Sequence, residues 1–497
     1  MDSLQLTMGI ELEFAVVYKA DAFADLTVVV PLQGSANVSA DQAIQHLLKQ
    51  AGIASHLSLE VPDEAPYAAW VIDYDTMQFT PAEEAAVPAG WKRHHIELQS
   101  RVFLSLHDDW AAEIRRVTEV LSKMRSNYHC AVISNPSAGF HVHMGNGPRL
   151  IPFPTAKRIA QLFTAFESRF DQMHAATRVL APGLDIEPFQ CEPDSAFWCA
   201  PASFFHWNFN ADGEILPLND RIHHSDKENV FNWTQRIENA ANYKRLADLN
   251  LVDSVCGDKT GHYAALNFEN CEDHGYLGDA IMKRTIEFRQ HTGTVDYSAI
   301  VNWMAFLGHV ARFCHITDDA DFIFLLTKAA DTNFTLAHLL AALGCGEDLI
   351  NHFQRTDEDG EIGSSRHPSP EASNAAAFID NPMVADLVAN NDDGQSEEYE
   401  WSTIAEKCAT KFDSGYYGLD PTAAALPLEL ADIRHLLGVA LSKAQLQCTR
   451  ENAVAQPESV ARALVFELLA RIYARLDNSV DPRPAVEAEY EAWMNQD

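Results

Sequence analysis

The stretch "TIEFRQHTGT", residues 285–294, places the polar side chains of Glu287, Arg289 and His291 at alternate positions and puts apolar residues before the first two. Successive side chains along a β-strand point to opposite faces, so residues two apart share a face. The alternation therefore predicts a strand with one apolar and one charged face. An antiparallel sheet with one solvated face shows the same pattern, so this strand alone does not distinguish a wet surface from a binding site.

Three further stretches show the same alternation, "GIELEF" at 9–14, "HIELQS" at 95–100 and "GFHVHMG" at 139–145. Their polar faces carry Glu11, Glu13, His95, Glu97, Gln99, His141 and His143. Shorter candidates of the same kind offer Asp73, Asp75, Asn267 and Glu269. Solvated strand faces usually carry Thr, Ser, Lys and mixed charges, whereas Glu-x-Glu and His-x-His recur here. The strands together therefore favour one shared polar site over several unrelated wet surfaces.

A divalent metal would explain the repeated carboxylates. Two glutamates on one strand face lie about 7 Å apart, and they repel one another and any further acids brought beside them. A bound cation removes that repulsion. Carboxylate oxygens suit Mg²⁺, and one or two imidazoles shift the preference toward Mn²⁺.

Arg289 adds a second clue, because it shares a strand face with Glu287. An arginine beside a metal-binding carboxylate can bind phosphate oxygens that the metal also bridges. The alternative is a simple ion pair across the sheet. Metal carboxylates beside such an arginine suggest phosphoryl transfer. The chain contains no GxxxxGK[ST] loop, so ATP would have to be held through metals on the sheet face.

Composition excludes several classes of function. The chain of 497 residues has 36 Lys and Arg against 71 Asp and Glu, a formal net charge of −35, so nucleic acid is not an expected partner. Nine scattered cysteines favour a reduced, cytoplasmic setting over a disulfide framework. The N-terminal sequence lacks the features of a signal peptide, and no apolar run is long enough to span a bilayer. We therefore expect no membrane partner.

The order of strand and helix patterns predicts an α+β protein with a catalytic domain over residues 1–315. Within it, helical spacing of apolar residues predicts helices at 107–127, 155–174 and 298–313. Residues 180–250 form a loop-rich insertion with many aromatic side chains, among them Trp198, Phe204, Phe205, Trp207 and Trp233. Such an insertion is either a lid over the site or a locally packed excursion.

Residues 316–497 have a different character, helical and acidic. Solvated, charged sequence predicts a flexible segment at about 355–400. Two strong helical patterns, around 428–448 and 458–476, follow it. We expect this region to be a helical C-terminal part outside the catalytic domain.

The ordered set "GIELEF", "ELQS", "GFHVHMG", "HYAALNF" and "TIEFRQHTGT" resembles the putative amidoligase family common in fungal genomes. That family looks related to glutamate–cysteine ligase and, more distantly, to glutamine synthetase. The resemblance spans roughly residues 8–310. It implies an ATP-dependent carboxylate–amine ligase built on a curved, mostly antiparallel sheet that forms a funnel for ATP and Mg²⁺ or Mn²⁺. Its substrates would be a small-molecule or peptide carboxylate and an amine.

Carried over position by position, the resemblance assigns roles to individual residues. The implied metal ligands are Glu11, Glu13, Glu97, His141, His143 and Glu287. The implied catalytic residues are Arg289, Glu287 and His141. The implied nucleotide-binding residues are Arg289, His143 and Lys259. Asp75 matches a family aspartate, and the sequence "ELQSRVF" departs from the family where relatives often have Ser-Pro.

The implied reaction joins a carboxylate to an amine. The carboxylate attacks the γ-phosphate of ATP, and the amine then displaces phosphate from the acyl phosphate. A glutamate or histidine takes the amine's proton, with His291 a weak candidate. Two alternatives remain open. One is an ATP-independent metal hydrolase or cupin-type enzyme that uses His141, His143 and one glutamate, and the other is a non-catalytic binding protein.

Overall fold

The computed structural model describes most of the chain outside a few segments. The described residues are 4–26, 37–62, 67–75, 77, 79, 81–105, 108–135, 137–175, 178, 229–249, 252–253, 259–260, 264–271, 283–354, 408–409, 419–420, 422–450, 456–476 and 481–496. Two predicted features lie mainly outside them. These are the flexible 355–400 segment and the part of the aromatic insertion before residue 229.

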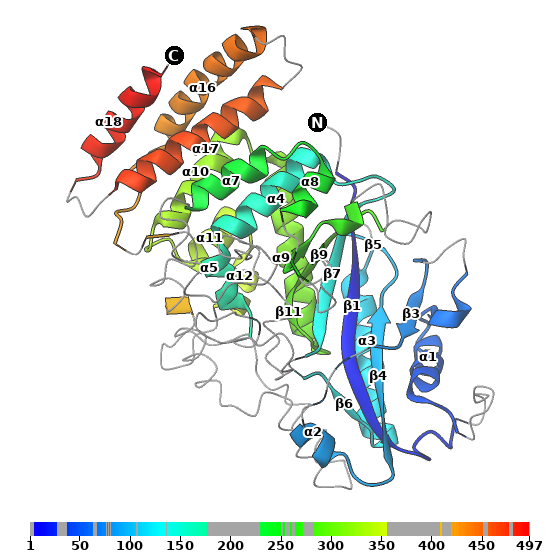
Figure 1. Ribbon diagram of the computed structural model, residues 1–497. Coiled ribbons are helices and arrows are strands. Elements are labelled where there is room, and N and C mark those ends of the chain that lie inside the picture. The colour runs from blue at the N-terminus through cyan, green and yellow to red at the C-terminus, as the bar shows by residue number, and fades with distance from the viewer. Residues whose placement is uncertain are drawn as a thin grey trace.

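A nine-stranded sheet organises the part of the chain before residue 293 (Figure 1). Its strands are β1 (Leu6–Lys19), β2 (Ser55–Leu57), β3 (Trp70–Asp73), β4 (Trp91–Gln99), β5 (Phe103–Leu104), β6 (Ala131–Ile133), β7 (Gly139–Asn146), β10 (Leu266–Asn267) and β11 (Ile286–Thr292). The order is β10-β11-β7-β1-β4-β3-β2, with β5 and β6 also pairing with β1. Among the strand pairs that the structure describes, only β2–β3 is parallel. The predicted α+β class and the mostly antiparallel sheet are confirmed.

The expected funnel-shaped sheet is not what these strands form. The sheet is open and does not curl back on itself, because β10 at one end and β2 at the other pair with one neighbour each. β1, 14 residues long, is the central strand and pairs with four others. Side chains projecting from the middle of an open sheet can be buried only by segments that pack over its face.

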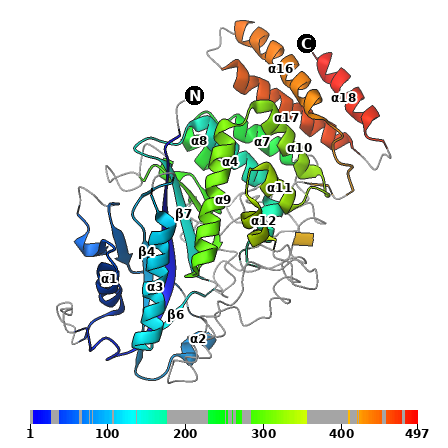
Figure 2. The same cartoon turned by 180° about the vertical axis from the view of Figure 1, so that it is seen from behind.

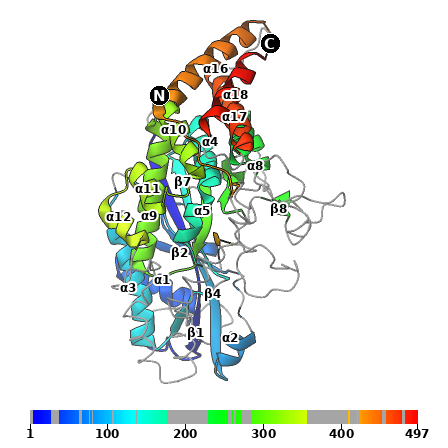
Figure 3. The same ribbon diagram turned by 90° about the vertical axis from the view of Figure 1, so that its left-hand side faces the viewer.

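The apolar face of the sheet is covered by helices. Ile10, Leu12 and Phe14 of β1 belong to one buried core with Phe140 of β7 and Phe288 of β11. Helices α3 (Trp110–Tyr128) and α9 (Tyr297–Ile316) lie behind the strands in Figure 1 and in front of them in Figure 2. Figure 3 places both helices on the same side of the sheet. The alternation thus separates an apolar, helix-covered face from a face that carries the polar rows.

The three helices predicted for the catalytic part are confirmed. α3 begins after Asp109, whose side chain accepts a hydrogen bond from the amide of Ala112. The pattern at 155–174 divides into α4 (Phe153–Ala165), α5 (Glu167–Phe170) and a 3₁₀ turn (Asp171–Met173). Smaller elements are α1 (Ala40–Gln50), α2 (Pro81–Ala86), α7 (Val230–Glu238), α8 (Tyr243–Asp248), α10 (Asp319–Thr327), α11 (Leu336–Ala342), α12 (Glu347–Phe353), β8 (Val252–Asp253) and β9 (Lys259–Thr260).

The C-terminal part is helical, as predicted. It contains α16 (Leu430–Arg450), α17 (Pro457–Arg475) and, beyond the two predicted helices, α18 (Arg483–Met494). α17 packs against α7 and α16 against α10, while α18 packs against α17, all away from the sheet (Figure 1). None of the helices in the described ranges has the length and apolar character needed to cross a membrane.

A buried ion-pair network ties α17 to α4 and α7. The carboxylate of Glu238, at the end of α7, lies 2.8 Å from Lys157 Nζ of α4 and 3.0 Å from an Arg462 amino group of α17. Ser459 of α17 donates to the same carboxylate at 2.9 Å. Removing one member of a buried network leaves its partners unpaired, so this contact holds the two parts together. The domain boundary at 315 stays a prediction.

Candidate functional site

The register of three neighbouring strands brings four polar side chains together. Glu11 of β1 lies opposite His141 of β7, and Glu287 of β11 lies opposite His143 of β7. Directly opposite residues of an antiparallel pair place their side chains on one face within contact range. All four residues are buried, with exposures of 7% or less. The polar row is therefore not the wet side of a sheet.

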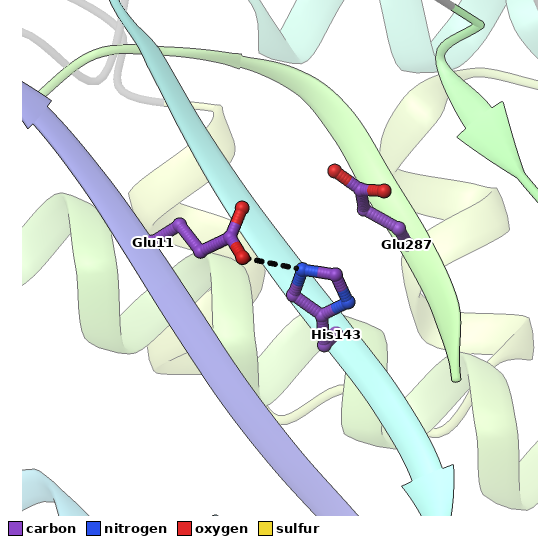
Figure 4. Close-up of side chains that lie close together, drawn as sticks. All are labelled: Glu11, His143 and Glu287. Carbon is purple, nitrogen blue, oxygen red and sulfur yellow. Dashed lines mark ion pairs between the residues drawn. The ribbon is translucent and has the colours of Figure 1, made fainter. Parts of the chain in front are cut away.

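Glu11, His143 and Glu287 form a group that could hold a metal ion. Each offers a ligand atom, and the three atoms lie within 4.8 Å of one another. The side chains come from β1, β7 and β11 and point toward one another, with Glu11 Oε1 3.0 Å from His143 Nε2 (Figure 4). Ligands about 2.0–2.6 Å from a shared ion have this mutual spacing. Two carboxylates and one imidazole suit Mn²⁺ and, less ideally, Mg²⁺.

Glu287 is held as an anion by its neighbours. An Arg289 amino group lies 2.5 Å from its Oε1, and the side chain of Asn267 donates to its Oε2 at 2.9 Å. Burial on its own would raise the pKa of Glu287, but the Arg289 guanidinium and the neighbouring His143 and His141 together outweigh burial and hold the pKa well below its usual range. The carboxylate is therefore charged and fixed in orientation.

His141 lies among three carboxylates. Its Nδ1 is 3.5 Å from oxygens of Glu11 and Glu13 and 3.9 Å from Glu287 Oε1. An Arg289 amino group is 3.2 Å from the same nitrogen. Burial and the Arg289 charge lower the pKa of His141 to about 4, so its imidazole is neutral at neutral pH.

Glu13 and Glu97 face each other across β1 and β4 on the same face of the sheet. Burial and the nearby Asp75 raise the pKa of Glu13 to about 8, and burial and Glu11 raise the pKa of Glu97 to about 8. Crowded carboxylates resist ionisation unless a cation neutralises them. This pair therefore marks a place where further positive charge would be favourable, next to the three-residue group.

Two charged residues near the site have no part in the alternating pattern. Lys283 Nζ donates to Glu11 Oε1 at 2.7 Å, and Arg178, 5% exposed, donates to the carbonyl of Ala138. Lys283 precedes β11 by three residues, so the strand pattern could not place it. The sequence signal for Lys283 was a basic pair, Lys283-Arg284, directly before the charged strand.

His291 does not share the face of Glu287, because β11 contains an irregularity. Phe288 pairs with Val142, but His291 pairs with Phe140, so two residues of β11 oppose one residue of β7 between these pairs. Such a bulge turns the following side chains to the other face. The His291 ring accordingly contacts Phe140 and Trp303 on the helix-covered face. The structure thus gives no support to His291 as the residue that takes the amine's proton.

The remaining predicted site residues occupy different places. Asp75 lies near Glu13 and accepts a hydrogen bond from the amide of Met77 at 3.1 Å. Lys259 begins β9 in a separate two-stranded sheet, and its side chain lies outside the described residues. Its role in nucleotide binding stays a prediction, as do the individual catalytic and ligand roles of the other residues.

Comparison with known families supports the resemblance found in the sequence. Residues 4–181 match a family model described as a putative amidoligase enzyme. No curated protein matches the chain. The matched segment carries Glu11, His141 and His143, whereas Glu287 and Arg289 lie beyond it on the strand that pairs with β7. The resemblance to amidoligases is confirmed. The wider relation to glutamine synthetase and the fungal origin stay predictions.

Proposed function

From the match to amidoligases and the buried polar group, we propose that this protein is an ATP-dependent carboxylate–amine ligase that forms ADP. One observation carries the proposal. Glu11, His143 and Glu287 offer ligand atoms within 4.8 Å of one another, on three neighbouring strands, with the guanidinium of Arg289 against the last of them. Carboxylates that can bind a metal, beside a fixed cation, form an arrangement suited to phosphoryl transfer.

The residues present fit the expected cofactors. Glu11, His143 and Glu287 would hold one divalent ion, and the crowded Glu13 and Glu97 would ligate a further ion with His141 nearby. A bound Mg²⁺ or Mn²⁺ would neutralise phosphate charge and orient the γ-phosphate of ATP. Arg289, His143 and Lys259 are the residues proposed to contact the nucleotide.

The proposed reaction has two steps. In the first, an oxygen of the substrate carboxylate attacks the γ-phosphorus, and the bond from that phosphorus to the ADP oxygen breaks. In the second, the amine nitrogen attacks the acyl carbon of the acyl phosphate, phosphate leaves, and the nitrogen gives its proton to a carboxylate or imidazole of the site. Arg289, 6% exposed, provides a positive charge that water does not screen, beside the transferred group.

Incubation with Mg-ATP and a panel of carboxylates and amines tests this function. We expect ADP release that depends on both substrates, and an amide product whose mass equals the sum of the two substrates minus water. ATP should also raise the melting temperature in the presence of Mn²⁺. No ADP with any pair, together with no ATP binding, would overturn the proposal.

The ATP-independent alternatives predict a different outcome. A hydrolase or cupin-type enzyme would turn over without nucleotide and would use both histidines of the His-x-His strand. Within the described residues, the group with metal-ligand spacing contains only His143 of that pair, together with two glutamates. This composition favours the ligase over the cupin-type enzyme.

Replacing Gly139 with alanine should disturb the site without removing a polar group. A Cβ at Gly139 would lie 2.2 Å from Nε2 of His141, so the imidazole would have to move. Because misplacing a site group by about 1 Å can cost about 100-fold, we expect kcat/KM for amide formation to fall by about that factor.

The matched control is Gly438→Ala in α16, where nothing lies within 4 Å of the new Cβ. This control should retain activity and be slightly more stable, since alanine is the better helix former. Equal activity of Gly139→Ala and the control would show that the position of His141 does not matter.

A further inference from the structure

The candidate metal group already has a cation of the chain bound to it. The ammonium of Lys283 lies 2.7 Å from Glu11 Oε1 and 3.5 Å from His143 Nε2. Those two atoms are themselves 3.0 Å apart and belong to two of the three residues with metal-ligand spacing. Lys283 thus contacts side-chain atoms of two of the three residues proposed to hold a divalent ion.

A metal ion and the Lys283 ammonium could not both contact Glu11 Oε1 without strong electrostatic repulsion. Metal–oxygen distances are about 2.0–2.2 Å for Mn²⁺- or Mg²⁺-like ions. An ion on Glu11 Oε1 would therefore lie no more than about 5 Å from Lys283 Nζ, which is 2.7 Å from the same oxygen. Two cations this close in a buried site repel strongly.

The surroundings of Lys283 and Arg289 indicate which of the two cations a metal ion would displace. Each of the two carboxylates has one cationic partner, Lys283 for Glu11 and Arg289 for Glu287. The Arg289 side chain is 8% exposed and also contacts His141, whereas the Lys283 side chain is 33% exposed. A half-buried lysine can move its ammonium to water on a flexible stem, but a buried guanidinium cannot.

The backbone before β11 directs the Lys283 side chain toward Glu11 and His143. Arg284 has a φ of 55°, the left-handed region that a non-glycine residue adopts at a cost, and its side chain donates to the carbonyl of Pro148. On its other side, Thr285 Oγ1 is 3.0 Å from His143 Nδ1, a contact that orients the ring so that Nε2 faces Glu11. Lys283 and Thr285 therefore converge on Glu11 and His143 from one strained segment.

We propose that Lys283 is an internal cation that competes with a divalent metal ion for Glu11 and His143, so that metal binding displaces its ammonium. This inference rests on the proposed metal site and describes how metal binding there is regulated. Without metal, Lys283 neutralises Glu11. With metal bound, the displaced ammonium is free to pair with an anionic ligand, such as a phosphate or a carboxylate.

Mn²⁺ binding to metal-free protein, measured by calorimetry, tests the competition. Lys283→Met removes the charge and keeps the length of the side chain, so we expect about ten- to hundredfold tighter Mn²⁺ binding, the value of one lost charge-assisted hydrogen bond. Lys283→Arg keeps the charge and should bind Mn²⁺ about as the wild type does. Lys244→Met, at an exposed position of α8 where the ammonium lies 3.3 Å from Asp248 Oδ1, is the matched control for net charge and should leave binding unchanged.

A second measurement uses the wild-type protein, so it does not depend on whether Lys283→Met folds. Acetylation of Lys283 by an amine-reactive reagent, quantified by peptide mass spectrometry, should increase severalfold when Mn²⁺ replaces a chelator. Acetylation of Lys244 should not change. If wild type and Lys283→Met bind Mn²⁺ equally and Lys283 stays equally protected, the competition is overturned and the ligase proposal stands. If neither protein binds Mn²⁺ and no ADP forms, both proposals fail.

Discussion

Glu287→Gln is expected to lower the rate of amide formation by about 1,000-fold or more, while the protein stays folded. Glutamine has the same shape, but it removes one proposed anionic metal ligand and leaves Arg289 without the carboxylate that lies 2.5 Å away. The amide oxygen binds a divalent ion weakly, so Mn²⁺ affinity should fall with the rate. ADP release and calorimetric Mn²⁺ titration measure the two effects, and circular dichroism checks the fold.

A matched control separates this effect from a general loss of negative charge. Glu119→Gln makes the same chemical change at an exposed position of α3, on the far side of the sheet from the polar group. This variant should have wild-type activity. Wild-type activity in Glu287→Gln as well would remove Glu287 from the site and weaken the proposed metal group, because only Glu11 and His143 would remain.

Arg289→Met should affect stability as well as catalysis. Arg289 is buried and neutralises Glu287, so removing its charge leaves a buried carboxylate without its partner. Such a change typically costs about 3–5 kcal/mol in the free energy of unfolding. Loss of a fixed positive charge from the proposed phosphoryl-transfer site should also lower turnover by about 1,000-fold. Urea unfolding and ADP release measure these quantities.

The effect of Mn²⁺ on the stability of Arg289→Met distinguishes the loss of a charge from the loss of packing. Because Mn²⁺ would supply the missing positive charge near Glu287, it should restore part of the stability of Arg289→Met. Arg245→Met, on the exposed face of α8, has a side chain that is 64% exposed and should change stability little. If Arg289→Met is as stable as this control in the presence of a chelator, Arg289 does not neutralise the buried carboxylate.

The site also explains how a chain with a net charge of −35 can gather carboxylates on one buried face. Arg289 and Lys283 each pair with one glutamate of the candidate metal group, which balances Glu287 and Glu11. Among the described residues, no lysine or arginine pairs with Glu13 or Glu97 in this way, and burial and their acidic neighbours raise the pKa of both to about 8. The neighbourhood of these two carboxyls is where additional metal charge would be most favourable.

Much of this arrangement could be predicted because it is local. A period of two along "GIELEF", "GFHVHMG" and "TIEFRQHTGT" is set by the strand backbone itself, and helical spacing is equally local for α3 and α9. The polar faces named from these patterns do meet in the structure. The residue types on those faces were sufficient to suggest a site that binds a metal ion and phosphate groups. The family match, to a putative amidoligase enzyme, supports an enzyme that forms amide bonds.

Only the tertiary structure decided which of these residues meet and what else meets them. Register is a property of paired strands, so the sequence could not show that Glu11 and Glu287 flank His143 from two sides, nor that a bulge turns His291 to the helix-covered face. Lys283 reaches Glu11 across 272 residues of sequence, and no periodic pattern reports such a contact. The sequence by itself determined the polar faces of the strands, because side-chain alternation is local. Folding decided the composition, burial and charge balance of the site, because these depend on contacts between distant segments.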